Sequence, residues 1–117
     1  MASTDRTRIP ERDWKLLSQL TPVALERFCA RVLAEAARIT AAPGKTSHER
    51  YLKLYKLMEK QDRDLAFAFN DHRRSTALIK TARLHALGLL TEDELGAFTE
   101  ETRETVLFLL SLEAKSS

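Results

Sequence analysis

Few residues in this sequence can interrupt a helix, and this scarcity constrains the fold more than any other feature. Among 117 residues there are three glycines and three prolines. Between them, apolar residues recur at the i, i+3, i+4 and i+7 spacing of one helix face. No alternating apolar and polar run is long enough to predict a strand. The sequence therefore predicts an all-α protein, a compact bundle of five to six helices joined by short loops.

The clearest predicted helix is long and spans about residues 22–41. Thr21 precedes it as an N-cap, and Pro22 takes the first helical position, where a missing N–H group costs nothing. A shorter helix is expected before it, with Pro10 in the same role. The predicted organisation has three parts, namely a flexible N-terminal arm over residues 1–9, a single helical domain over 10–113 and a flexible tail over 114–117.

Two Thr-x-x-Glu sequences, which begin at Thr46 and Thr91, predict capping boxes. In this motif the threonine oxygen and the glutamate carboxylate each accept a bond from a free backbone N–H group at the helix start. Residues 47–87 are expected to form two helices or one kinked helix. Because Asp62 interrupts the apolar stripe, a break or kink is predicted near residues 60–62, with a straight continuation as the alternative.

The segment HALGLLTEDEL, residues 85–95, contains a glycine stop followed by the second of these capping boxes. It is similar in local form to the glycine, leucine, threonine and acidic turn of many bacterial helical hairpins, including short oligomerisation modules. The resemblance is confined to these residues. It implies a corner between two helices and nothing about activity.

The segment Gly44-Lys45-Thr46 has the form of the last residues of a phosphate-binding loop. The full motif requires a first glycine where this sequence has Ile39, and it requires a preceding strand where the periodicity is helical. Pro43 also removes a backbone donor that would contact a phosphate. A helix stop followed by a capping box is therefore predicted here, and a nucleotide site is not.

Residues that could support catalysis or metal binding are sparse. His48, His72 and His85 form no pair at i, i+3 or i+4, so no helical metal-binding motif is present. The single cysteine, Cys29, lies on the apolar stripe of a predicted helix and is expected to pack in the core. Serine nucleophile motifs are absent. We therefore predict no catalytic residue, metal or cofactor, and a protein that is not an enzyme.

Charge is unevenly distributed along the chain. The net charge is +2, but residues 1–37 hold six basic and five acidic side chains, residues 38–85 hold eleven and five, and residues 86–117 hold two and seven. Such asymmetry is typical of a nucleic-acid patch or of association between opposite ends. Ordinary helix electrostatics also explains it, because cations favour helix C-termini and anions favour N-termini.

The segment NDHRRSTALIKTARLH, residues 70–85, is the best candidate for a functional surface. At 100° per residue, its cations lie opposite the apolar face and share the outer side with two leucines. A central helix buried on several sides is the competing interpretation. The predicted contact surface consists of Arg73, Arg74, Lys80, Arg83, Leu84 and Leu87.

These observations favour a small non-enzymatic helical protein of bacterial type that acts through protein–protein contact or self-association, with a homo-oligomer expected. The absence of a long apolar run and the single cysteine predict a cytoplasmic protein without a membrane span. The alternative is a weak nucleic-acid-binding protein with a basic surface around residues 50–83. That surface would use Arg50, Lys53, Arg73, Arg74, Lys80 and Arg83 to bind phosphates.

Overall fold

The computed structural model describes the backbone of residues 8–116 and the side chains of residues 8–113. Within this part of the chain there are five α-helices, one 3₁₀-helix and no strand, so the all-α prediction is confirmed. The elements in order are α1 (Glu11–Ala41), α2 (Ser47–Phe69), the 3₁₀-helix η1 (Arg74–Thr76), α3 (Ala77–Ala86), α4 (Glu92–Gly96) and α5 (Glu100–Ser116).

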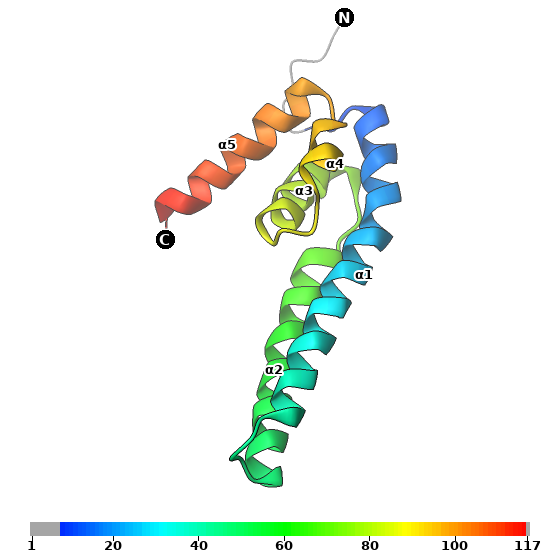
Figure 1. Ribbon diagram of the computed structural model, residues 1–117. Helices are drawn as coiled ribbons and strands as arrows, with labels where there is room; N and C mark the ends of the chain where they lie inside the picture. The colour runs from blue at the N-terminus through cyan, green and yellow to red at the C-terminus, as the bar shows by residue number, and fades with distance from the viewer. Residues whose placement is uncertain (1–7, 117) are drawn as a thin grey trace, which may run out of the picture.

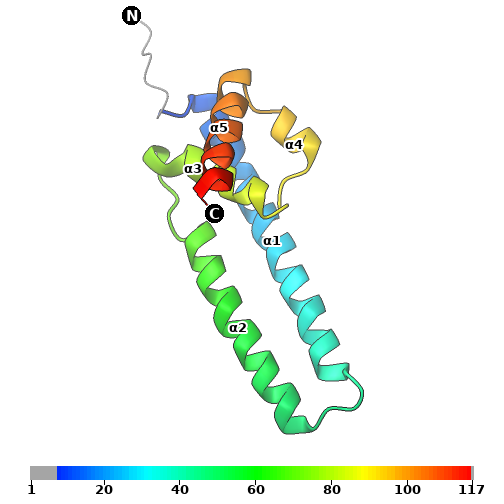
Figure 2. The same ribbon diagram turned by 90° about the vertical axis from the view of Figure 1, so that its left-hand side faces the viewer.

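Two regions make up the molecule. Residues 28–69 form a hairpin arm, in which the C-terminal half of α1 runs antiparallel to α2 (Figure 1). Residues 8–27 and 70–113 form a head, in which α3, α4 and α5 gather around the start of α1 (Figure 2). The molecule measures 65 × 30 × 23 Å and its radius of gyration is 17.4 Å. A globular domain of this length has about 13 Å, and the protruding arm accounts for the difference.

Helix α1 is continuous where two helices were expected. Its end at Ala41 confirms the predicted end, but its start at Glu11 shows that the predicted start at residue 22 is wrong. Pro22 lies inside the helix with its side chain exposed, so the ring is accommodated on the solvent side. An interior proline costs about 3 kcal/mol. Burial of neighbouring α1 residues on the opposite side, Leu17, Leu20 and Ala24, offsets that cost.

Both predicted capping boxes are present. The Thr46 hydroxyl accepts a bond from the backbone of Glu49 at 3.1 Å, and the Thr91 hydroxyl accepts one from Glu94 at 3.1 Å. Helix α2 then runs through residues 60–62, so the break predicted there is wrong and the straight continuation is found. Asp62 is exposed, and its carboxylate therefore imposes no break. The helix ends instead at Phe69.

The core lies mainly in the head and is centred on α3. This helix packs against α5 on one side and contacts α1 and α2 on the other, so it is buried around most of its circumference. Ile9 is also buried in this core, although it falls in the predicted arm over residues 1–9. Arg8 of that arm is exposed, and its residues 1–7 lie outside the described residues. The largest apolar side chains that are fully buried are those of Phe98, Leu17, Leu84, Leu89 and Val106.

A buried carboxylate fastens α5 to α1. Asp13 is fully buried and accepts three hydrogen bonds, from the Thr99 backbone N–H at 3.0 Å, the Thr99 hydroxyl at 2.6 Å and the Thr102 hydroxyl at 2.5 Å. The Thr99 hydroxyl in turn accepts a 3.4 Å bond from the Thr102 backbone. Asp13 thus serves the start of α5 as the glutamate of a capping box serves its own helix.

Candidate contact surface on the hairpin arm

The contact surface predicted around α3 does not exist as one patch. Lys80 is 3% exposed and Leu84 is fully buried, so their assignment to an outer face is wrong. The reason is the position of α3 between α5 and the α1–α2 pair, which covers both sides of the helix. Leu87 is 40% exposed but lies beside α1, where its carbonyl accepts a 2.6 Å bond from Arg31. A central helix buried on several sides is therefore what the structure contains.

The remaining cations of that prediction have partners within the molecule. Arg73 pairs with Asp71 at 2.6 Å. Arg74 pairs with Glu11 at 3.2 Å and lies 5.2 Å from the Trp14 ring centroid. The Arg83 guanidinium lies 3.6 Å from the Phe67 ring centroid. Of the two arm residues in the nucleic-acid alternative, Arg50 donates to the Ala42 carbonyl at 2.7 and 3.1 Å, and Lys53 is exposed.

The glycine-lysine-threonine turn is a helix stop, as predicted. Gly44 has φ of 74°, the left-handed conformation that glycine adopts without strain. The Thr46 hydroxyl and backbone N–H both bond within the capping box, and Lys45 pairs loosely with Glu49 at 3.9 Å. The Thr46 N–H group and the Lys45 ammonium, which a phosphate-binding loop would direct at its ligand, are thus both directed at Glu49 at the start of α2.

A polar cluster that sequence reasoning missed lies at the junction of α1, α3 and the segment after α2. His72 stacks on Trp14 with 4.5 Å between ring centroids. Its Nδ1 lies 2.9 Å from Lys80 Nζ, and its Nε2 lies 3.2 Å from Ser18 Oγ. Desolvation by burial lowers the pKa of both Lys80 and His72, and the Lys80 charge lowers that of His72 further.

The hydrogen-bond directions in this cluster follow from the donors that Lys80 can offer. An ammonium group has donors only, so Lys80 donates to Nδ1 and the proton of the neutral imidazole resides on Nε2. Nε2 then donates to Ser18 and cannot remove its proton, which is what a catalytic base must do. The cluster fastens the connection between α2 and α3 to α1.

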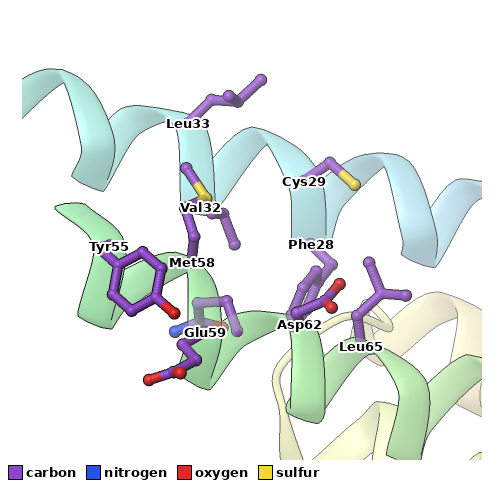
Figure 3. A pocket seen from close by; sticks show the side chains of 10 residues that line it. Phe28, Cys29, Val32, Leu33, Tyr55, Met58, Glu59, Asp62 and Leu65 are labelled. Atoms are coloured by element: carbon purple, nitrogen blue, oxygen red, sulfur yellow. The ribbon is translucent and has the colours of Figure 1, made fainter.

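The hairpin arm carries the most distinctive surface feature in the described part of the chain, an apolar groove of about 500 Å³ between α1 and α2. Figure 3 shows the side chains that line it on both helices. Helix α1 contributes Phe28, Cys29, Val32 and Leu33, and α2 contributes Tyr55, Met58, Glu59, Gln61, Asp62 and Leu65. We call this surface, together with the adjoining Tyr51, the arm groove.

Helical spacing explains why these residues share a face. Cys29 and Leu33 are four apart on α1, and Tyr51, Tyr55 and Met58 follow at i, i+4 and i+7 on α2. Phe28 and Ile39 of α1 are buried, and the Phe28 ring meets the Phe69 ring of α2 edge-on. The outward side chains stay accessible. Leu33 is 64% exposed, Tyr51 63%, Tyr55 56% and Met58 38%.

The opposite side of the hairpin arm has a different character. A smaller hollow there, of about 300 Å³, is lined by both signs of charge. Arg31 in this hollow bonds the carbonyls of Leu87 and Gly88, which ties the polar side of the arm to the head. The arm therefore has one side with charged residues, which Arg31 ties to the head, and one side on which large apolar side chains are exposed. The charged lining residues of the polar side are Arg31, Glu35, Lys60 and Asp64.

Sequence reasoning missed the arm groove because helical periodicity assigns Cys29 and Leu33 to one apolar stripe with Phe28 and Val32, and such a stripe is expected to be core. In the structure this stripe is only partly covered, since Phe28 is buried whereas Leu33 is 64% exposed.

The described residues contain no group of three or more His, Cys, Asp or Glu side chains arranged to hold a metal ion. None of the helices in the described range has the length and apolar character needed to cross a bilayer. Comparison with family models, with curated proteins and with solved structures gives no match.

Proposed function

We propose that this chain is a non-enzymatic helical protein that acts through protein–protein contact, and that the arm groove is its contact surface. The observation that carries the proposal is the asymmetry of the hairpin arm. Its polar side is fastened to the head, whereas its apolar side exposes Leu33, Tyr55 and Met58 around an open groove. A two-helix hairpin with such a side is suited to receiving a further helix.

The energetics favour occupation of the arm groove. Fully burying one large apolar side chain contributes about 1.5–3 kcal/mol, and aromatic residues and methionine are enriched at protein interfaces. A third helix laid in the groove, at the usual interaxial distance of about 8–10 Å, would contact both α1 and α2. Recognition of this type uses an amphipathic helix laid into an apolar groove, with anchors at i, i+3, i+4 and i+7.

The nucleic-acid alternative has less support. Its residues do not form one surface, because Lys80 is buried and Arg50 binds a helix-end carbonyl. Arg73 and Arg74 are each paired with a carboxylate. A phosphate would have to displace these partners, which weakens the electrostatic gain on which such binding depends.

Two variants, each of which replaces one exposed aliphatic residue with glutamate, test the proposal. Leu33→Glu places a charge in the arm groove, and the matched control Ile79→Glu makes a similar change on α3, where the side chain is 45% exposed. Each tagged protein is recovered from its own cell, and its self-association is measured by sedimentation. We expect a partner that wild type and Ile79→Glu retain and Leu33→Glu loses. Equal behaviour of all three proteins would contradict the proposal.

A further inference from the structure

The arm groove is apolar at its base and acidic at its edges. Ten residues line it, of which two are charged, and both of these, Glu59 and Asp62, are carboxylates. Glu26 is exposed and lies three residues before Cys29 and seven before Leu33, which places it on the same face of α1. Acidic side chains therefore border the groove on both helices.

The residues that line the groove include no cation. The ion pairs found among the described side chains involve neither Glu59 nor Asp62. Lys56 and Arg63 lie three residues before and four residues after Glu59 and so neighbour it on the surface of α2, but neither is among the residues that line the groove. The polar hollow on the other side differs, because there Arg31 and Lys60 accompany Glu35 and Asp64.

From this charge pattern we infer that the occupant of the arm groove is a basic amphipathic helix of another protein, with an apolar stripe flanked by lysine or arginine on both sides. The inference rests on the proposed function of the groove and names its partner class. The apolar stripe would cover Leu33, Tyr55 and Met58. The flanking cations would reach the carboxylates on α1 and α2, as charges at positions e and g do in a coiled coil.

A second copy of this chain fits the arm groove less well. A twofold dimer apposes the same face of both subunits, so Glu59 and Asp62 would face a second groove whose lining includes no cation. The other exposed apolar face of the described chain, on α5, is no better matched. It carries Leu107, Phe108 and Leu112, and exposed Glu100, Glu101 and Glu104 are on the same helix.

The probes for the test are two labelled helical peptides of about 18 residues, which span the roughly 15 Å from Tyr55 to Leu65 with a turn or more beyond each end. Both have leucine at a and d of each heptad. One has lysine at e and g, and the other has glutamate there. Fluorescence anisotropy measures Kd for each peptide. We expect the lysine peptide to bind roughly tenfold or more tightly than the glutamate peptide.

Charge-reversal variants locate the preference. The double variant Glu59→Lys/Asp62→Lys should reverse the order of the two peptides. Asp64→Lys is the matched control, because Asp64 is only two residues from Asp62 but lines the polar hollow. It should leave the preference for the lysine peptide in place. Leu33→Glu should weaken both peptides, since the apolar stripe then meets a charge.

Each other outcome rejects a distinct part of the reasoning. Equal binding of the two peptides, or a preference that Asp64→Lys changes as much as the double variant does, overturns the inference and leaves the groove as a contact surface. A wild-type dimer that Leu33→Glu dissociates does the same, because a second copy is then the occupant. Lysine-peptide binding that Leu33→Glu leaves unchanged also overturns it. No peptide binding, together with no self-association, overturns the proposed function as well.

Discussion

Replacing Asp13 with alanine should destabilise the protein more than any other single polar substitution considered for the head. The carboxylate is fully buried and accepts three hydrogen bonds from Thr99 and Thr102 at 2.5–3.0 Å. The alanine variant leaves a backbone N–H group and two hydroxyls at the start of α5 without their acceptor. Helix α5 then loses its attachment to α1.

The size of the effect follows from two opposing contributions. A hydrogen bond to a charged group contributes about 1.5–3 kcal/mol, so three such bonds have a gross value of roughly 5–9 kcal/mol. Removing the carboxylate also removes the several kcal/mol spent on desolvating it. The net loss expected for Asp13→Ala is about 3–4 kcal/mol. A domain of this size has about 5–15 kcal/mol of stability in total, so the variant should stay folded but be clearly weakened.

Urea unfolding followed by circular dichroism measures this loss. Thr102→Val removes one of the three donors and should cost about 1–1.5 kcal/mol. Asp13→Asn keeps an acceptor for the Thr99 N–H group and should fall between the two. In the double variant Asp13→Ala/Thr102→Val, the losses should be less than additive by about 1 kcal/mol or more. A loss below about 1 kcal/mol for Asp13→Ala would refute the assignment of Asp13 as the cap of α5.

Three further predictions concern other contacts. The pKa of Glu94 is lowered from 4.5 to about 2, chiefly by its hydrogen bond from Arg27. The pair should therefore stabilise the fold fully above pH 4.5 and progressively less toward pH 2. The urea midpoints of wild type and Glu94→Gln should converge over that range. Lys80→Met should raise the pKa of His72 only part of the way to 6.5, because burial is the larger cause of its lowering, and NMR titration of the ring measures the shift. The same variant should change stability by no more than about 1 kcal/mol, because the lost hydrogen bond is offset by the buried charge that disappears. Gly44→Ala should cost about 1–2 kcal/mol in urea unfolding purely through its φ of 74°, since no neighbouring atom lies within 4 Å of the added carbon.

Local signals in the sequence predicted local structure well. Both Thr-x-x-Glu sequences form capping boxes, and Gly44 and Gly88 adopt the positive φ expected where a helix stops. These devices work because every interacting group lies within a few residues along the chain. Pro22 shows the limit of such signals. The proline pattern suits a helix start equally well, and burial of α1 side chains against the head determined that the helix continues.

Contacts distant in sequence could not be predicted. The start of α5 reads Thr-x-x-Thr, so the carboxylate of a capping box is missing locally, and Asp13 supplies it from 86 residues away. Lys80 and Leu84 were placed on a surface because periodicity identifies one buried face and cannot show that a helix lies between two neighbours. In the opposite sense, Leu33 and Tyr55 have the periodicity of core residues, but the hairpin arm leaves them exposed.

The most direct test of the arm groove uses Cys29, the single cysteine of the chain, whose half-buried side chain lines the groove (Figure 3). Its reaction with a disulfide reagent such as dithiobisnitrobenzoate is followed by absorbance, with the lysine peptide or the glutamate peptide at up to about 1 mM, the concentration range of weak complexes. The rate should fall about tenfold or more with the lysine peptide, in proportion to the unoccupied fraction, and little with the glutamate peptide. In Leu33→Glu, neither peptide should protect Cys29. A Cys29 rate that neither peptide changes in the wild-type protein would contradict the assignment of the arm groove as a binding site for a basic helix.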